Sequence, residues 1–392
     1  MKTISHWIDG RIVESTSGNT SPVYDPATGS QTAEVGLASV AELDAAVAAA
    51  KAAFPAWRSS SLSKRAEVMF RLRELVDANR KEIASLVTAE HGKVLSDAMG
   101  EVARGLENIE FACGIPQLIK GDYSEQAAGG VDVYSIRQPL GVVAGITPFN
   151  FPAMVPMWMF ANALACGNTF VLKPSEKDPS VALYLAELLA QAGLPAGCFN
   201  VVQGDKVAVD AILEHDDIAA VSFVGSTPIA KYIYETGTSN GKRVQALGGA
   251  KNHMLVLADA DVDMAADAAV GAGYGSAGER CMAISVVLAA ESIADELVAK
   301  IAERIPSIKV GPGNEPDNEM GPLITAEHRD RVRGYVNNAP EEGATLVVDG
   351  RAGVPSSGYF LNPTLLDNVT TDMACYRDEI FGPVLSVMRV AG

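Results

Sequence analysis

The strongest candidate for chemistry in this sequence is Cys281. In the stretch GERC an acid, Glu279, and a base, Arg280, come directly before the cysteine, and the glycine-rich run GYGSAG comes before them. A thiolate is the nucleophilic form of cysteine, and a neighbouring guanidinium favours it, so Cys281 could attack a carbonyl carbon. The glycines would let backbone approach closely beside it. Taken alone, Cys281 has a simpler interpretation as an inert core thiol, because free cysteine is among the most buried residue types.

Three short loops carry the other candidate groups: TPFN, KPSE and VGST. Asn150 could donate its amide to a developing oxyanion, or make only a local turn hydrogen bond. Lys173 and Glu176 could bind the hydroxyls of a ribose, or form only a charged loop. Ser226 and Thr227 could cap a helix whose free amides bind a phosphate, although an ordinary capped turn is the preferred interpretation of this motif alone.

The elements that must position these loops follow from periodicity. Residues 40–113 repeat apolar positions at helical spacing, and 121–140 alternates as a hairpin that leaves the main body. From residue 141 the pattern becomes strand, turn, helix, repeated, which predicts a doubly wound parallel sheet with ligand-binding loops at the carboxyl ends of its strands. We therefore expect an α/β fold with a nucleotide-binding domain of residues 1–120 and 141–248, the hairpin 121–140, and a second α/β domain of residues 249–392.

GYGSAG matches the dinucleotide fingerprint G-x-G-x-x-G, but its context does not. That fingerprint requires a strand before it and a helix after it, whereas a helical pattern, VDMAADAAVGAGYG, leads into this run. We therefore interpret the glycines as permitting a close backbone approach beside Cys281.

Composition excludes several classes of function. The chain has 392 residues with 48 acidic and 31 basic side chains, and its net charge of -17 disfavours binding to nucleic acid or to an anionic membrane. Five cysteines, with no CxxC pair, fit a reducing compartment and predict neither a disulfide framework nor a metal site. The start MKTISHWIDG lacks the features of a signal peptide. A bacterial cytosol is the expected location, with a processed organelle as the alternative.

The order ITPFNFP, VLKPSE, FVGST, ALGGAKN, GERC and DEIFGPV along the chain resembles the aldehyde dehydrogenase superfamily. Within it, ALGGAKNH and GSAGERCMAIS are similar to the CoA-acylating branch that oxidises methylmalonate and malonate semialdehydes. The resemblance implies that Cys281 attacks the aldehyde and that Asn150, with the backbone amide of Cys281, stabilises the oxyanion. Hydride then passes to NAD. The cofactor-binding residues that it implies are Thr147, Phe149, Lys173, Glu176, Gly225, Ser226, Glu379 and Phe381.

The resemblance also bears on cofactor and substrate. An acid at Glu176 would repel a 2′-phosphate, so NAD is expected rather than NADP. Hydrolytic relatives carry a glutamate base where this chain has Ala246, and its absence favours transfer of the acyl group to CoA. Arg280 and Arg104 match the branch's carboxylate-binding pair, whereas Arg104 alone would be read as part of a solvated helix face. Loss of CO2 would then give propionyl-CoA or acetyl-CoA.

Family chains continue beyond EIFGPV, so the second domain is expected to be incomplete relative to the family. Two alternative functions remain open from the sequence. One is a hydrolytic aldehyde dehydrogenase with its base elsewhere, and the other is a non-catalytic member that binds nucleotide. The resemblance further implies a homo-oligomer, a dimer or tetramer, built on the 121–140 hairpin.

Overall fold

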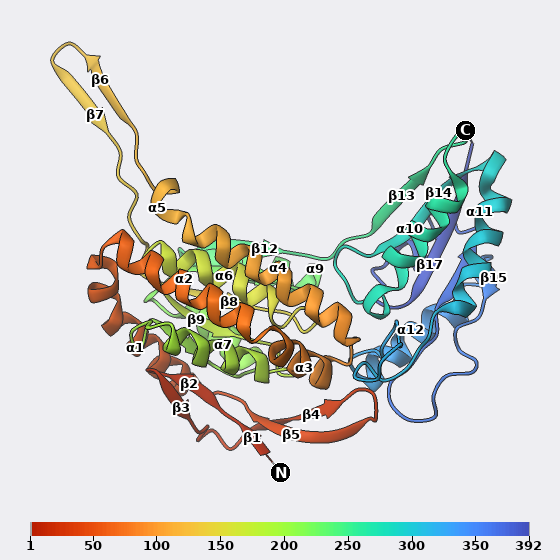
Figure 1. Cartoon of the computed structure of the whole chain (residues 1–392), viewed down its shortest axis with the longest axis horizontal. Coiled ribbons are helices and arrows are strands. Elements are labelled where there is room, and N and C mark those ends of the chain that lie inside the picture. Colours follow the sequence, from red (N-terminus) through yellow and green to blue (C-terminus); the bar gives the residue numbers. More distant parts are fainter. Residues whose placement is uncertain (1, 392) are drawn as a thin grey trace. The chain divides into compact units, whose positions relative to one another are not determined.

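A computed structural model describes residues 2–391 and shows an α/β protein with two compact units (Figure 1). The first unit comprises the chain up to Val23, Ala33–Leu86 and Met99–Gly248. The second comprises Tyr24–Thr32, Val87–Ala98 and the chain from Gly249 onward. Two segments from the first 120 residues thus pack with the second unit. One reason is that the Leu95 amide donates to the Gly313 carbonyl at 3.0 Å.

The first unit is built on a seven-stranded sheet. Its spatial order is β12 (Arg243–Leu247), β11 (Ile218–Val224), β8 (Val142–Ile146), β9 (Thr169–Lys173), β10 (Phe199–Val201), β2 (His6–Ile8) and β3 (Arg11–Val13). The strands from β12 to β10 run parallel, which confirms the predicted parallel sheet, while β2 and β3 add an antiparallel edge. These edge strands have three residues each, too few to show an alternating pattern in the sequence.

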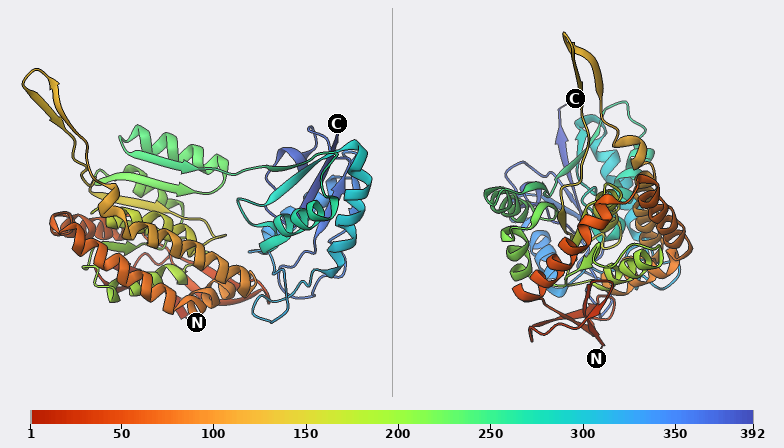
Figure 2. Two further views of the ribbon diagram at one scale, coloured as in Figure 1. Left: turned by 45° about the horizontal axis from the view of Figure 1, so that its top comes forward. Right: turned by 90° about the vertical axis from the view of Figure 1, so that its left-hand side faces the viewer.

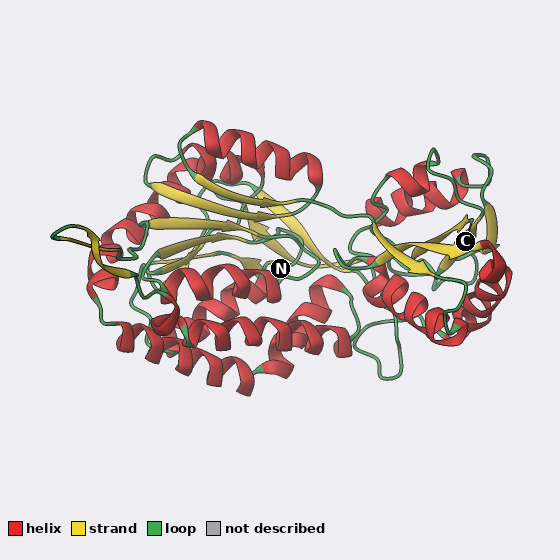
Figure 3. Ribbon diagram, turned by 90° about the horizontal axis from the view of Figure 1, so that it is seen from above, coloured by secondary structure: helices red, strands yellow, loops and turns green. Residues whose placement is uncertain are grey.

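Helices cover both faces of this sheet, so it is doubly wound (Figure 3). The helices α1 (Val40–Ser59), α8 (Lys206–Glu214) and α9 (Thr227–Ser239) pack in sequence along one face. The helices α6 (Met154–Ala165), α7 (Ser180–Gln191) and α2 (Leu62–Ala78) form a second group. The stretch predicted to be helical also contains α3 (Arg80–His91) and α4 (Leu95–Cys113), followed by the short α5 (Ile115–Leu118). Strands β1 (Lys2–Ile4), β5 (Ser30–Gly36) and β4 (Thr20–Asp25) form a small separate sheet.

The predicted hairpin consists of β6 (Tyr123–Ala128) and β7 (Val131–Tyr134). Both views in Figure 2 show it standing away from the body of the first unit. Every residue of the two strands is exposed, including Val131, Val133 and the ring of Tyr134. Its proposed part in oligomerisation stays a prediction.

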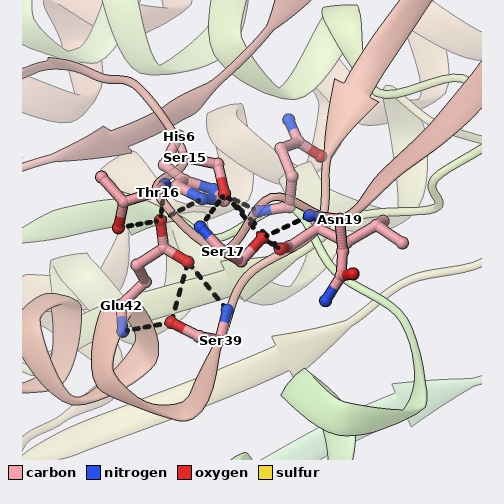
Figure 4. Close-up of polar contacts among 9 residues, drawn as sticks. His6, Ser15, Thr16, Ser17, Asn19, Ser39 and Glu42 are labelled. Atoms are coloured by element: carbon pink, nitrogen blue, oxygen red, sulfur yellow. Dashed lines mark hydrogen bonds and ion pairs between the residues drawn. The ribbon is translucent and has the colours of Figure 1, made fainter.

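The start of α1 is fixed by the buried carboxylate of Glu42 (Figure 4). The Ser39 hydroxyl accepts from the Glu42 amide at 3.3 Å, and the Glu42 carboxylate accepts from the Ser39 amide at 2.8 Å, a capping box. The same carboxylate accepts from the Thr16 amide at 2.6 Å and lies 3.7 Å from the His6 ring. Burial alone would raise the pKa of Glu42, but these hydrogen bonds outweigh it and lower the pKa to about 2.

The second unit has its own sheet, in the order β13 (Asn252–Val256), β14 (Ile284–Ala290), β17 (Val384–Val390), β16 (Thr364–Asp367) and β15 (Thr345–Val348). The first four strands are parallel and β15 is antiparallel. Helices α10 (Val262–Tyr274) and α11 (Glu291–Arg304) pack on each other and on β14 and β17. The remaining elements are η1 (Gly275–Gly278), η2 (Ile305–Ser307), α12 (Ala326–Asn338) and α13 (Ala374–Arg377).

Within residues 2–391, each helix is either too short or too polar to cross a membrane.

Candidate functional site

The register of the first sheet brings the three candidate loops to one edge. Ile146, at the end of β8, pairs with Phe223 of β11 on one side and with Lys173 of β9 on the other. The loops that follow these strands therefore start at the same level. Ligands of doubly wound sheets bind at such carboxyl ends. The candidate residues gathered along this edge are Thr147, Phe149, Asn150, Lys173, Glu176, Gly225 and Ser226.

The loop after β8 is held by buried partners. The Thr147 amide donates to the Lys173 carbonyl at 3.1 Å, and both Thr147 and Asn150 are buried, each 4% exposed. The Phe149 ring lies under the ammonium of Lys177 at 4.8 Å. Beyond the loop, the buried carboxylate of Glu101 accepts from the amides of residues 153 and 154 at the start of α6, at 2.8 and 3.1 Å. Sequence reasoning did not single out Glu101, because an acid in a helical stretch gives no sign of its distant partner.

Lys173 and Glu176 form an ion pair of 3.3 Å at the end of β9. The Lys173 side chain is buried, whereas about a third of the Glu176 side chain is exposed. Burial acts to raise the pKa of Glu176, but the charges of Lys173 and Lys177 and a backbone hydrogen bond outweigh it, and the pKa is lowered. Glu176 is therefore a carboxylate at neutral pH, able to accept hydrogen bonds from ligand hydroxyls.

The turn between β11 and α9 leaves a helix N-terminus accessible. Ser226 is the N-cap residue, as the sequence suggested, and Pro228 lies in the first turn. The Ser226 side chain is exposed and makes no capping hydrogen bond within the described chain. The Ser226 hydroxyl thus does not cap this 13-residue helix, whose N-terminus carries the positive end of the helix dipole. At Gly225 an added Cβ would lie 2.4 Å from the Phe223 ring, so this position needs glycine.

The backbone before Cys281 is unusually constrained. Ser276, Ala277 and Gly278 all have positive φ, at 52°, 53° and 71°, a region that residues with a side chain rarely adopt. A Cβ on Gly278 would lie 2.2 Å from the Gly382 carbonyl oxygen, so the glycine permits a close approach of two backbones. This confirms the interpretation of the glycine-rich run. The helix α10 precedes it, which agrees with rejecting the dinucleotide fingerprint.

Cys281 is half-buried and lines a small pocket in the second unit. The side-chain amide of Asn252 donates to the carbonyls of Cys281 and Ala283 at 2.8 and 3.0 Å, which fixes the chain on both sides of the thiol. Burial raises the pKa of the Cys281 thiol, and the negative charge of Glu379 raises it further. The resting state is therefore the protonated thiol.

The expectation that Arg280 favours the Cys281 thiolate does not hold in this structure. The Arg280 guanidinium forms an ion pair of 2.6 Å with Asp97, and the other oxygen of Asp97 accepts from the Ser276 amide at 3.0 Å. The charge of Arg280 is thus balanced by a carboxylate of its own chain. Sequence reasoning missed Asp97, which is 183 positions away along the chain.

Glu379 and Phe381 line the same pocket as Cys281 and Arg280. The Glu379 carboxylate accepts from the Ala250 amide at 3.2 Å. Phe381 has φ 58°, so the backbone turns sharply beside the pocket. The structure therefore brings together, within the second unit, the predicted nucleophile, one predicted carboxylate-binding arginine and the predicted nicotinamide-side pair.

Arg104 and Ala246 belong to the first unit. The Arg104 side chain is 68% exposed and donates to both carboxylate oxygens of Glu107 on its own helix, at 2.9 and 3.1 Å. That is the geometry of a solvated helix face. Ala246 lies in β12 and pairs with Phe223. The functional role of Ala246 stays a prediction, as does the role of every other candidate residue.

Comparison with known proteins identifies the family of this chain. The model of the aldehyde dehydrogenase family matches residues 12–392. Malonate-semialdehyde dehydrogenase from Pseudomonas aeruginosa is 52% identical over 395 residues, covering 100% of this chain and 79% of that protein. Methylmalonate-semialdehyde dehydrogenase from Oceanimonas doudoroffii has a solved structure with TM-score 0.98 and 54% identity, covering 100% of this chain and 81% of that one.

A second solved structure comes from Sinorhizobium meliloti. It is a protein provisionally assigned as methylmalonate-semialdehyde dehydrogenase, in complex with NAD, with TM-score 0.99, 54% identity and coverage of 100% of this chain and 81% of that one. This chain therefore belongs to the aldehyde dehydrogenase family. It is an oxidoreductase that acts on a small-molecule substrate.

Proposed function

We propose that this protein oxidises methylmalonate or malonate semialdehyde with NAD and transfers the acyl group to CoA, through a thioester on Cys281. The observation that carries the proposal is the pocket in which Cys281 adjoins Arg280 and Glu379. The names of the similar proteins support the choice of semialdehyde.

The residues at the edge of the first sheet fit NAD. The ionised Glu176 can accept from the ribose hydroxyls, with Lys173 holding the carboxylate in place. The N-terminus of α9, which begins after Gly225 and the exposed Ser226, suits a pyrophosphate. Since Glu176 is anionic, it also opposes a 2′-phosphate. NAD, when bound, accepts the hydride from the substrate carbon.

Cys281 carries the acyl group in this proposal. The thiol gives its proton to water as the sulfur adds to the aldehyde carbon, and the side-chain amide of Asn150 and the backbone amide of Cys281 donate to the resulting oxyanion. When hydride has left the carbon, the acyl group is a thioester of Cys281. The malonyl-type thioester on Cys281 loses its carboxylate as CO2, and its α-carbon takes up a proton from water. The sulfur of CoA, as thiolate, then attacks the acyl carbon and displaces the thiolate of Cys281, which gives propionyl-CoA or acetyl-CoA.

Ala246 supports acyl transfer over hydrolysis. Alanine has no proton acceptor, so it cannot activate a water, whereas the thiol of CoA ionises more readily and is a stronger nucleophile. We also propose a homo-oligomer built on the exposed 121–140 hairpin and a location in the bacterial cytosol, consistent with the bacterial origin of the proteins compared.

The proposal predicts that sustained NADH formation depends on CoA. Purified protein with NAD and methylmalonate semialdehyde should form NADH in a burst of at most one equivalent per site, and then continue only when CoA is added. The measurement is NADH absorbance with and without CoA, with propionyl-CoA identified by mass spectrometry. Full-rate NADH formation without CoA would instead identify a hydrolytic enzyme. Tight NAD binding with no NADH under either condition would identify a non-catalytic nucleotide-binding protein.

Arg280 is predicted to select the substrate carboxylate. Arg280→Met should lower kcat/KM for methylmalonate semialdehyde by about 10- to 100-fold, because a hydrogen bond to a charged group is worth roughly 1.5–3 kcal/mol. Propanal, which has no carboxylate, should be oxidised nearly as before. Arg104→Met tests the second predicted arginine in the same assay. If a variant keeps the preference for methylmalonate semialdehyde over propanal, the arginine that it replaces does not bind the substrate carboxylate.

A further inference from the structure

The segment Asp378–Phe381 follows the last residue of α13 and precedes β17, so it lies outside the regular helices and strands. Its carbonyl oxygens therefore need partners from elsewhere in the fold. Phe381 also needs outside support, because its φ of 58° is unfavourable for a residue with a side chain. The same segment carries Glu379 and Phe381 into the Cys281 pocket.

Three basic side chains supply hydrogen-bond partners to this segment. The Lys251 ammonium donates to the Asp378 carbonyl at 2.7 Å and also to the Cys375 carbonyl at 2.7 Å. The Arg331 guanidinium donates to the Glu379 carbonyl at 3.0 Å. The His328 ring contacts the Phe381 carbonyl through Nε2 at 2.6 Å. A carbonyl can only accept, so His328 carries its proton on Nε2.

The arrangement follows from one face of α12. His328, Arg331 and Tyr335 are three and four positions apart, so they line one side of the helix. Along this side His328 meets residue 381, Arg331 meets residue 379, and the Tyr335 hydroxyl donates to the Asp378 carboxylate at 3.0 Å. The helix thus follows the segment in the opposite direction, and Lys251 contacts it from the loop before β13.

The helix α12 is also connected to the backbone just before Cys281. The carboxylate of Glu279, which is fully buried, accepts from the Ile324 amide at 3.2 Å just before α12. It also lies 3.5 Å from Nε2 of His328. His328 therefore stands between the residue two positions before Cys281 and the carbonyl of Phe381.

We propose that Lys251, His328 and Arg331 are positioning residues, which hold the Asp378–Phe381 segment so that Glu379 and Phe381 face the nicotinamide end of NAD. The inference rests on the proposed function in assigning the cofactor, and it adds three residues that act on the cofactor through the backbone of this segment. Lys251 lies in the motif ALGGAKN and the other two lie outside the motifs that defined the family resemblance.

The test uses the full chain with single substitutions that remove one donor each: Lys251→Met, His328→Phe and Arg331→Met. Conservative variants that keep a donor, namely Lys251→Arg, His328→Gln and Arg331→Lys, test for rescue. Matched controls are Lys300→Met and Arg329→Met in the same unit. Lys300 pairs with side-chain carboxylates, and Arg329 donates to the Gly358 carbonyl, away from this segment.

Two measurements apply to each variant: the dissociation constant of NAD by titration, and hydrogen exchange of the peptide that covers residues 376–384. We expect the donor-removing variants to weaken NAD binding by about 10-fold and to speed exchange in this peptide. In turnover, KM for NAD should rise more than kcat falls. The conservative variants should recover most of the loss and the controls should resemble the wild type. When two of these donors are removed together, the loss of NAD binding free energy should be smaller than the sum of the two single losses, since both donors act on one segment.

Unchanged exchange and unchanged NAD affinity in all three variants would overturn the inference. Equal losses in Lys300→Met would also overturn it, because the effect would then be general loss of stability. Arg331 is exposed, so its replacement gives a folded protein even if a change at Lys251 does not. If the wild type does not bind NAD at all, the proposed function fails, and the exchange data still decide whether these side chains hold the segment.

Discussion

Replacing Cys281 by alanine is expected to lower NADH formation by about 10³-fold or more, because the covalent adduct from which hydride leaves forms on its sulfur, and the Ser285 hydroxyl in the same pocket donates to the Asn252 carbonyl. The measurement is the steady-state rate with saturating NAD, semialdehyde and CoA, together with NAD titration to show that the variant still binds the cofactor. The side chain is half-buried and small, so the fold should tolerate the change.

Cys113→Ala is the matched control for this prediction. Cys113 is also half-buried with a pKa raised by burial, but it lies at the end of α4 in the first unit. It should keep the wild-type rate. A Cys281→Ala protein that forms NADH at the normal rate would remove the thioester from the mechanism, and with it the reason for a CoA requirement.

Replacing Glu42 by glutamine is expected to destabilise the first unit by about 3 kcal/mol at pH 7. The figure follows from a pKa lowered from 4.5 to about 2, at about 1.36 kcal/mol per tenfold change in proton affinity. Glutamine keeps the shape but replaces one acceptor oxygen by an amide donor, which would face the donors on residues 16 and 39. Urea unfolding monitored by fluorescence measures the difference.

The stabilisation by Glu42 should depend on pH, because only the ionised carboxylate provides it. The Glu42 pKa is lower in the folded chain, so the stabilisation is fully present above about pH 5 and is lost as the pH falls from about 4.5 to 2. The difference in the free energy of unfolding between the wild type and Glu42→Gln should therefore shrink towards zero over that range. Glu74→Gln, on an exposed surface of α2, should unfold like the wild type at each pH. A constant gap from pH 7 to pH 2.5 would mean that Glu42 acts by packing rather than by charge.

Much of the fold was determined locally and could be predicted from the sequence. The alternation of strand and helix patterns after residue 141 predicted a parallel, doubly wound sheet, because each element must bury one face and parallel strands need crossover helices. The loops at Asn150, Lys173 and Ser226 then had to lie at one edge, as the register confirms. The short strands at the start of the chain escaped prediction, since three residues carry no period.

The identity of the chemical groups was likewise present in the sequence, since Cys281 and the motif residues around it are read directly. Their state was decided by tertiary structure. Arg280 is paired with Asp97, and Glu379 lies close enough to Cys281 to raise its pKa; neither neighbour adjoins its partner in sequence. The hydrogen bonds of Lys251, His328 and Arg331 to the segment Asp378–Phe381 likewise join residues that are far apart in the sequence. Periodicity predicts elements because it reports burial along one element, whereas charge balance and side-chain partners depend on which distant elements the fold brings together.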